Sequence, residues 1–375
     1  MKIVIDKDIP FIKGVLENHA KVVYLPGRDI SRTDVMDADA LIIRTRTRCN
    51  EALLKGTSVK FIASATIGFD HIDTEFCERE HIVWTNAKGC NSSSVQQYVA
   101  AVLFHLSDKL EFELAGKTIG IVGVGNVGSK VAALCLTLGM RVLLNDPPRE
   151  RLEGSKGFAS LDQISEESDI VTFHIPLEFE GHDRTYHLVD EKFLLTMKST
   201  QILVNTSRGE VVDTKALIAT LKAHGLAACV LDVWENEPEI DLELMNLVEI
   251  ATPHIAGYSA DGKANGTSMS VQALSSFFSL GLEGWYPPDV PLPEASEIEL
   301  DCRSLKQQKV ACKLVSRTYD LLADDQRLRN SPRTFEHQRA AYPLRREFPT
   351  YTAKLLNADD AVRSMVKKIG FTFAA

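Results

Sequence analysis

Three polar side chains follow three successive apolar runs in the middle of this chain. They are Arg208 in NTSRG, Glu237 in DVWENEP and His254 in TPHIAG. An imidazole can take up or release a proton near neutral pH, and a carboxylate behind it fixes its tautomer. A guanidinium binds a carboxylate with two parallel hydrogen bonds. Together the three side chains could hold a small hydroxy or keto acid and move a proton on it, provided that the fold brings them together.

The apolar runs predict an arrangement that does so. Nearly continuous apolar runs at 117–124, 141–146, 169–175, 201–207, 227–234 and 248–254 predict buried strands of a doubly wound parallel sheet. Shorter runs at 2–6, 22–25, 40–44, 60–64 and 83–86 predict a second parallel α/β domain, and helices are expected at 92–110 and 265–282. Because ligands bind beyond the carboxyl ends of parallel strands, the three side chains are expected at one edge.

A glycine-rich motif, GVGNVG, joins the first of the longer apolar runs to a helical pattern. Its glycines permit a tight turn, let the backbone approach a pyrophosphate and let helix and strand pack closely, while the next amides face the phosphates. A carboxylate at the end of the following strand would bind a ribose hydroxyl and favour NAD over NADP. The expected cofactor contacts here are Gly123, Gly125, Asn126, Val127, Gly128 and Asp146.

The combination of GVGNVG, NTSRG, DVWENEP and TPHIAG resembles the D-2-hydroxyacid dehydrogenase family. The resemblance implies an α/β protein with an NAD-binding Rossmann domain that transfers a hydride between NAD and a 2-hydroxy acid. It makes Arg208 the ligand of the substrate carboxylate and C2 oxygen, Glu237 the residue that orients the imidazole, and His254 the acid/base. It also implies cofactor contacts from Ile175, through its backbone, and from Thr206, Ser207, Arg208, Asp232 and Gly257.

Segments near the N-terminus narrow the expected substrate. If LIIRTRTRCN is extended, Arg44, Arg46 and Arg48 share one face and could bind a phosphate; a solvated strand end is the alternative. IRTRT, SATIGFDHID, NAKGCNSSSVQQYV and HIAGYSADGK resemble a branch of the family that oxidises a phosphorylated four-carbon hydroxy acid. That resemblance implies substrate contacts from Arg44, Thr45, Thr66 and Tyr258.

The expected domain order is interrupted. Residues 1–93 and 260–284 would form a flavodoxin-like substrate-binding lid domain, and 94–259 the NAD-binding domain. The proline-rich stretch 285–293 predicts a linker, after which the resemblance implies an α+β dimerisation domain at 294–375 and hence a homodimer. The two larger domains are expected to close around the substrate. If the C-terminal domain lies over the partner's cleft, Arg345 or Arg346 in YPLRREF could reach the substrate phosphate.

Composition excludes several other classes. The 375 residues are 45% hydrophobic and carry a net charge of −9, which favours neither nucleic acid nor an anionic membrane as partner. Seven scattered cysteines without C-x-x-C spacing indicate a reducing, cytoplasmic location and no metal site, and the N-terminus shows no signal peptide. Two alternatives stay open: another dehydrogenase of the family, such as one acting on 3-phosphoglycerate, or an NAD-sensing protein like the corepressors of this fold.

Overall fold

The computed structural model describes residues 1–374 and divides the chain into two compact units. The first unit comprises Met1–Asn91 and Ser259–Pro291, and the second comprises Ser92–Tyr258 together with the residues from Leu292 onward. The C-terminal residues thus belong to the same unit as the glycine-rich motif. The domain boundaries expected from the sequence stay predictions. No helix within residues 1–374 is long and apolar enough to cross a bilayer.

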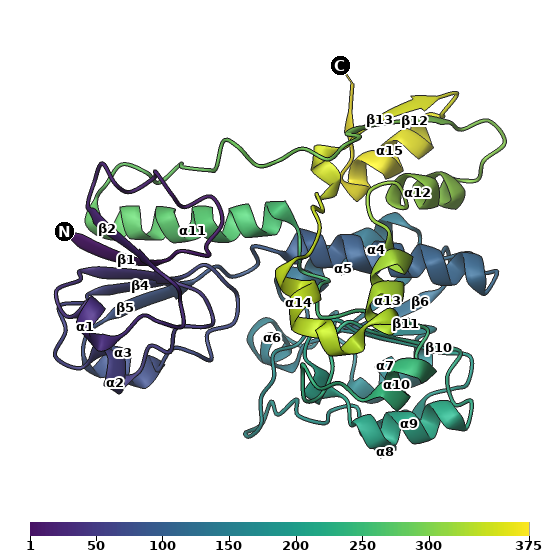
Figure 1. Cartoon of the computed structure of the whole chain (residues 1–375). Helices are drawn as coiled ribbons and strands as arrows, with labels where there is room; N and C mark the ends of the chain where they lie inside the picture. The colour runs from purple at the N-terminus through teal and green to yellow at the C-terminus, as the bar shows by residue number, and fades with distance from the viewer. Residues whose placement is uncertain (375) are drawn as a thin grey trace. The chain divides into compact units, whose positions relative to one another are not determined.

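The first unit is built on a five-stranded parallel sheet in the order β2-β1-β3-β4-β5. Its strands are β1 (Lys2–Asp6), β2 (Lys21–Leu25), β3 (Ala40–Ile43), β4 (Phe61–Ser64) and β5 (Val83–Asn86). The helix α11 (Ala260–Phe278) covers one face, and the short helices α1 (Arg32–Val35), α2 (Glu51–Leu54) and α3 (Thr74–Arg79) cover the other (Figure 1). Both faces are therefore covered, which explains why every residue of β3 and β4 is buried.

The second unit contains a six-stranded parallel sheet in the order β11-β10-β9-β8-β6-β7. Its strands are β6 (Thr118–Val122), β7 (Arg141–Asn145), β8 (Ile170–Phe173), β9 (Ile202–Asn205), β10 (Ala228–Leu231) and β11 (Ile250–Ala251). The helices α4 (Ser92–Lys109) and α5 (Asn126–Thr137) pack on one face, and α7 (Leu161–Glu167), α8 (Glu191–Thr196), α9 (Thr214–Lys222) and α10 (Leu242–Leu247) on the other. The chain reverses direction across the sheet between β7 and β8, the position where doubly wound sheets bind dinucleotides.

The C-terminal part of this unit has a small sheet of its own, β12 (Glu297–Asp301), β13 (Thr352–Leu356) and β14 (Thr372–Phe373). The family resemblance implied an α+β domain here. All three strands run parallel, and parallel strands need crossover helices between them. The helices are α12 (Gln307–Val315), α13 (Leu321–Asn330), α14 (Phe335–Ala340) and α15 (Asp360–Ile369). Because α12 and α15 bury their apolar faces against α4 and α5, this part shares a core with the six-stranded sheet.

Two expected strands end early. The first, β3, stops at Ile43, and Thr47 N donates to Arg44 O at 3.2 Å to close a turn. The prediction that Arg44, Arg46 and Arg48 alternate along an extended strand is therefore wrong. The second, β11, has only two residues instead of the seven expected, because the backbone after Ala251 turns to bond the carboxylate of Asp232.

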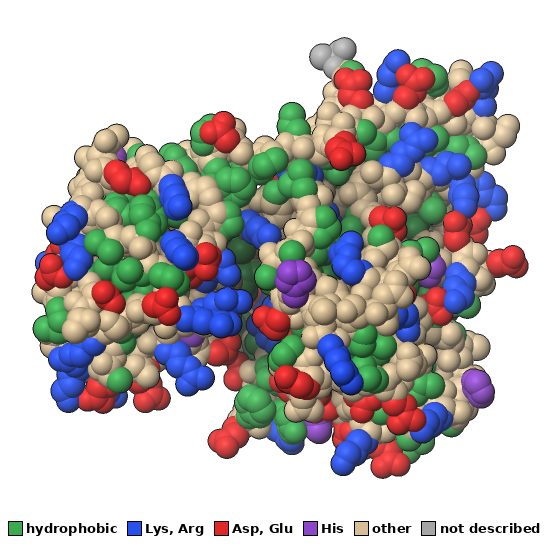
Figure 2. Space-filling view, in the orientation of Figure 1, with side chains coloured by type: hydrophobic (Ala, Val, Ile, Leu, Met, Phe, Trp, Pro, Cys, Tyr) green, Lys and Arg blue, Asp and Glu red, His purple; other side chains and the backbone are tan. Residues whose placement is uncertain are grey.

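The surface carries both signs of charge. In Figure 2, basic and acidic side chains are interspersed over the face shown. On this face the excess of acid recorded in the composition forms no single patch, and any cationic binding site has to be local.

Candidate active site

A histidine–carboxylate pair lies beyond the carboxyl ends of β10 and β11. Glu237 Oε2 lies 2.7 Å from His254 Nδ1, and Glu237 Oε1 accepts a hydrogen bond from Trp234 N at 2.9 Å. The carboxylate is thereby fixed at both oxygens. The side chains of His254 and Glu237 keep 30% and 19% of their surface exposed, so that the imidazole is accessible. With Nδ1 bound to the carboxylate, Nε2 is the atom available for proton transfer.

The backbone of the loop that carries His254 is hydrogen-bonded to Asp232. His254 N donates to Asp232 O at 2.6 Å, and the amides of Ile255 and Ala256 donate to the two carboxylate oxygens at 2.8 Å each. Thr252 Oγ1 donates to the same carboxylate at 2.6 Å. Asp232 is 1% exposed, and burial raises its pKa. The cofactor contact predicted for Asp232 stays a prediction. In the structure this carboxylate binds the backbone of the loop that carries His254.

Arg208 is carried by the loop that follows β9, next to the Glu237 loop. Asn205 shapes this loop by donating to Arg208 O and by accepting hydrogen bonds from the amide and hydroxyl of Ser207. An added Cβ on Gly209 would lie 1.9 Å from the backbone carbon of Trp234, so the two loops are in close contact. The structure thus places Glu237 on His254 and puts half-buried Arg208 on the adjacent loop.

The glycine-rich loop between β6 and α5 has the shape of a dinucleotide cradle. Gly123 has φ +87, and an added Cβ there would lie 2.5 Å from His174 O. At Gly128 an added Cβ would lie 1.9 Å from Gly123 O, whereas at Gly125, the N-cap of α5, it would meet nothing within 4 Å. Asp146, after β7, accepts a hydrogen bond from Val124 N at 2.8 Å and so holds this loop. The open side at Gly125 and the neighbouring carboxylate fit a dinucleotide pyrophosphate and ribose.

His174, which the sequence reasoning missed, lies between two residues predicted to contact the cofactor. It follows β8, precedes Ile175, and its Nδ1 lies 3.1 Å from the hydroxyl of Thr206. Its Nε2 lies 3.1 Å from the hydroxyl of Thr172, and burial lowers its pKa to about 3. The ring is therefore neutral at physiological pH and orients Thr206 by hydrogen bonding. A histidine at a strand end beside the glycine motif was the available signal.

The predicted substrate residues of the first unit lie at the ends of β3 and β4. Arg44 Nη1 donates to Asp8 O at 2.6 Å, Thr45 is exposed, and the Thr66 hydroxyl lies 2.8 Å from that of Ser64. The sequence reasoning did not single out Lys263, in the first turn of α11. Burial lowers the pKa of Lys263, and the nearby charge of Arg44 adds to the effect, so two cations lie close together here.

Tyr258, predicted to contact substrate, packs against the C-terminal part of its own unit. Its ring meets that of Tyr342 edge-on at 5.8 Å, and the Arg339 guanidinium lies 5.7 Å from its centre. Arg345 is 5% exposed and donates to backbone carbonyls of its own chain. Both Arg345 and Arg346 are buried within their own chain, and the expectation that one of them reaches a partner's substrate stays a prediction.

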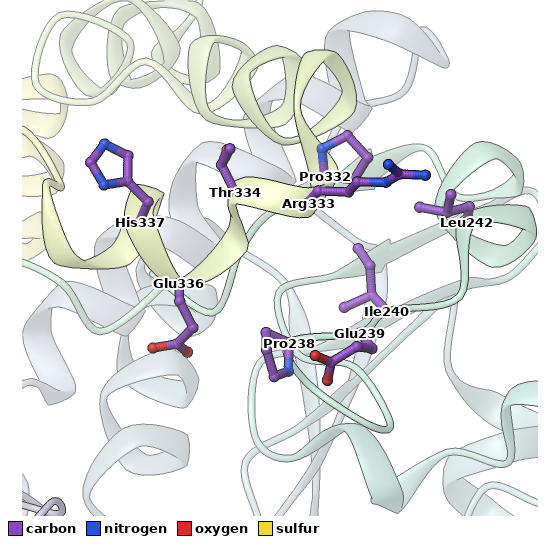
Figure 3. Close-up of a pocket in the computed structure, with 9 residues that line it drawn as sticks. All are labelled: Pro238, Glu239, Ile240, Leu242, Pro332, Arg333, Thr334, Glu336 and His337. Carbon is purple, nitrogen blue, oxygen red and sulfur yellow. The ribbon is translucent and has the colours of Figure 1, made fainter.

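A cavity of about 680 Å³ opens beside the Glu237 loop. Figure 3 shows the residues that line it: Pro238, Glu239, Ile240, Leu242, Pro332, Arg333, Thr334, Glu336 and His337. Neither His254 nor Arg208 lines it. The cavity therefore lies between the loop that follows Glu237 and the start of α14.

The fold and site define a class of enzyme. Residues 91–256 match the family described as D-isomer specific 2-hydroxyacid dehydrogenase, NAD binding domain, and residues 290–370 match a domain of unknown function. A crystal structure of D-lactate dehydrogenase from Aquifex aeolicus, complexed with NAD and lactic acid, superposes with a TM-score of 0.59. It is 27% identical and covers 76% of this chain and 98% of its own. The present chain is a D-2-hydroxyacid dehydrogenase with NAD as its cofactor.

Full-length relatives narrow the class. Erythronate-4-phosphate dehydrogenase from Bacteroides fragilis is 50% identical over 94% of this chain and 98% of its own length. The protein of the same name from Bacteroides thetaiotaomicron is 51% identical over 94% of this chain and 98% of its own, and that from Escherichia coli O157:H7 is 39% identical over 99% and 98%. The chain belongs to the erythronate-4-phosphate dehydrogenase family.

Proposed function

We propose that this protein oxidises 4-phospho-D-erythronate at C2 to (R)-3-hydroxy-2-oxo-4-phosphooxybutanoate with NAD, a step in the biosynthesis of pyridoxal 5'-phosphate. The observation that carries the proposal is the contact of Glu237 with His254, at 2.7 Å. It occurs in a chain that is 50% identical, over 94% of its length, to erythronate-4-phosphate dehydrogenase from Bacteroides fragilis. The contact supplies an oriented base, and the identity indicates the substrate.

The side chains divide the work. The glycine-rich loop and Asp146 would hold NAD, which when bound supplies the acceptor for the hydride of C2. His254 Nε2 removes the proton of the C2 hydroxyl, and Glu237 stabilises the imidazolium that forms. Arg208 binds the substrate carboxylate and the C2 oxygen, and its charge favours the carbonyl that develops there. A positioned acid/base of this kind contributes about 10²–10⁴ to the rate.

The substrate contacts follow the family resemblance. Arg44, Thr45 and Thr66 of the first unit and Tyr258 of the second are proposed as substrate ligands. Lys263 is added to them, because its charge lies near that of Arg44 and two neighbouring cations suit a dianionic phosphate. In a chain of net charge −9, such a local pair is the kind of site that an anionic substrate requires.

A turnover assay with matched acids tests the proposal. We expect kcat/KM for 4-phospho-D-erythronate to exceed that for unphosphorylated erythronate by about 10²-fold or more, since each lost charge-assisted hydrogen bond costs about 1.5–3 kcal/mol. A higher kcat/KM for 3-phospho-D-glycerate would assign another reaction of the family. If no hydroxy acid reduces NAD although the protein binds NADH, an NAD-sensing role would be favoured. The His254→Ala variant serves as the control for background reduction.

The assembly and location are proposed with the activity. The seven free cysteines, six of them buried, suit a cytoplasmic location. By the family resemblance, the part that matches the domain of unknown function at residues 290–370 is proposed to form a homodimer. Light scattering of the purified protein checks the dimer, for which a monomer mass at micromolar concentration would be the contrary result.

A further inference from the structure

One arginine of the C-terminal part is bonded to the loop that carries the catalytic histidine. Arg345 Nη2 lies 2.5 Å from Ala256 O and 3.2 Å from Ser94 O. Ala256 follows His254 by two residues, and Ser94 lies in the first turn of α4. A single guanidinium therefore joins the catalytic loop to the start of the longest helix in this unit, although Arg345 lies far from both in sequence.

The residues next to Arg345 fix its backbone to the same helix. Ser94 Oγ donates to Glu347 Oε1 at 2.7 Å, and Gln97 Nε2 donates to Arg346 O at 2.9 Å. These groups are buried. The segment 345–347 is thus held in place independently of the catalytic loop, which makes Arg345 a fixed donor that the loop can bond to.

The environment of Arg345 is expensive for a cation and has to be compensated. The side chain is 5% exposed, its guanidinium lies 4.6 Å from the centre of the Tyr319 ring, and its Nε and Nη1 have no hydrogen-bond acceptor within residues 1–374. The negative charges of the buried Asp324 and Asp232 stabilise the positive charge of Arg345. An apolar side chain would fill this space at less cost. What it could not supply is a directed donor for the carbonyl of Ala256.

The amide and the carbonyl of Ala256 are thus each hydrogen-bonded to a buried charged side chain. The amide of Ala256 donates to Asp232 Oδ2 at 2.8 Å, and its carbonyl accepts from Arg345. A second contact lies just beyond, where the ring of Tyr342 packs edge-on against Tyr258. The loop is therefore held at its amides by the six-stranded sheet and at its carbonyl by the C-terminal part.

We propose that Arg345 is a positioning residue: by fixing the carbonyl of Ala256 it sets the place of the His254 imidazole, so that the C-terminal part completes the active site of its own chain. This role is separate from dimer formation, and it rests on the proposed function only for its kinetic readout. It explains why a part without cofactor or substrate motifs shares its core with the dinucleotide-binding sheet.

The kinetic test compares Arg345→Met, Arg345→Lys and the control Arg363→Met. Arg363 is an exposed arginine of the same part whose Nη2 also donates to a backbone carbonyl, that of Leu355 at 3.0 Å. We expect Arg345→Met to lower kcat about 10–100-fold, since small misplacements of reacting groups cost up to about 10². The dissociation constant for NADH should change by no more than about threefold, because the cradle is bonded elsewhere. Arg345→Lys, which keeps charge and a donor, should recover most of the loss.

Hydrogen exchange tests the positioning without using activity. The amides of Ile255 and Ala256 should exchange faster in Arg345→Met than in the unaltered protein or in Arg363→Met. A folded Arg345→Met with unaltered kcat and unaltered exchange would overturn the proposal. Loss of folding in both Arg345 variants would also count against it, because Arg345 would then serve general stability. If the unaltered protein fails to oxidise 4-phospho-D-erythronate, the proposed function fails, while the exchange result still decides the role of Arg345.

Discussion

Replacing Glu237 by glutamine tests the central contact of the site with almost no change of shape. Glu237 accepts two hydrogen bonds, from Trp234 N at 2.9 Å and from His254 Nδ1 at 2.7 Å. A glutamine can keep the first with its amide oxygen, but its NH₂ group then faces Nδ1. Two donors cannot share that contact, so the imidazole must accept at Nδ1 and carry its proton on Nε2.

The expected loss has two parts. Losing a hydrogen bond between a carboxylate and an imidazolium costs about 1.5–3 kcal/mol, which corresponds to about 10–150-fold in rate. The wrong tautomer adds to this, because a protonated Nε2 of His254 has no lone pair to take the substrate proton. The same exchange in the catalytic triad of serine proteases lowers kcat about 10⁴-fold. For Glu237→Gln we therefore expect a fall in kcat of about 10³–10⁴, with the KM for NAD nearly unaltered.

The assay follows NADH formation from 4-phospho-D-erythronate under saturating conditions, with single-turnover measurements to isolate the chemical step. Glu239→Gln is the matched control, because this carboxylate lies two residues further on the same loop and is exposed. It should keep kcat within about twofold. A kcat for Glu237→Gln within tenfold of the unaltered enzyme would refute the reasoning, since the imidazole would then not depend on this carboxylate for its tautomer.

The remaining predictions concern the cofactor side. Gly125→Ala should keep its melting temperature but bind NADH more weakly, because the added Cβ meets no protein atom within 4 Å. Gly128→Ala should lose about 1–3 kcal/mol of stability, because its Cβ would lie 1.9 Å from Gly123 O. Calorimetry measures the stability of both variants, and NADH fluorescence measures their binding. Acid should destabilise the protein through His174: its pKa is about 3 when folded and near 6.5 when unfolded, so the unfolded state binds more protons and the free energy of unfolding falls as pH drops from about 6.5 towards 3. Urea unfolding across this range should show a shallower fall for His174→Gln, and equal slopes would contradict the assignment.

Much of the fold could be predicted because the signals are local. A strand followed by GVGNVG and a helical pattern predicts a dinucleotide cradle, and the family match confirms NAD as the cofactor. The three polar strand ends were equally informative, since parallel strands deliver their carboxyl ends to one edge. The contact of Glu237 with His254 follows from that rule, although its distance does not.

An error arose where a structure was predicted from a periodic pattern in the sequence without knowledge of the contacts that the residues make. Alternating arginines at Arg44 to Arg48 predict a strand face only if the chain stays extended, and the hydrogen bond from Thr47 N to Arg44 O turns it instead. The α+β assignment of the C-terminal part came from the family resemblance, and the sequence alone could not show the order and direction of short strands such as β14. The bonds that Arg345 makes could not be predicted, because its partners Ser94 and Ala256 lie far from it in sequence.

The position of His254 shows why such distant groups matter for catalysis. Its φ of +55 lies in the left-handed region, which costs a residue with a Cβ about 1–2 kcal/mol, so the loop needs other bonds to keep it there. The bonds come from a carboxylate, Asp232, that is buried and accepts from Thr252, Ile255 and Ala256. A buried carboxylate needs donors, and the loop amides are the donors it has. The strained histidine and the buried aspartate therefore stabilise each other, and removing the carboxylate of Asp232 should release the imidazole of His254.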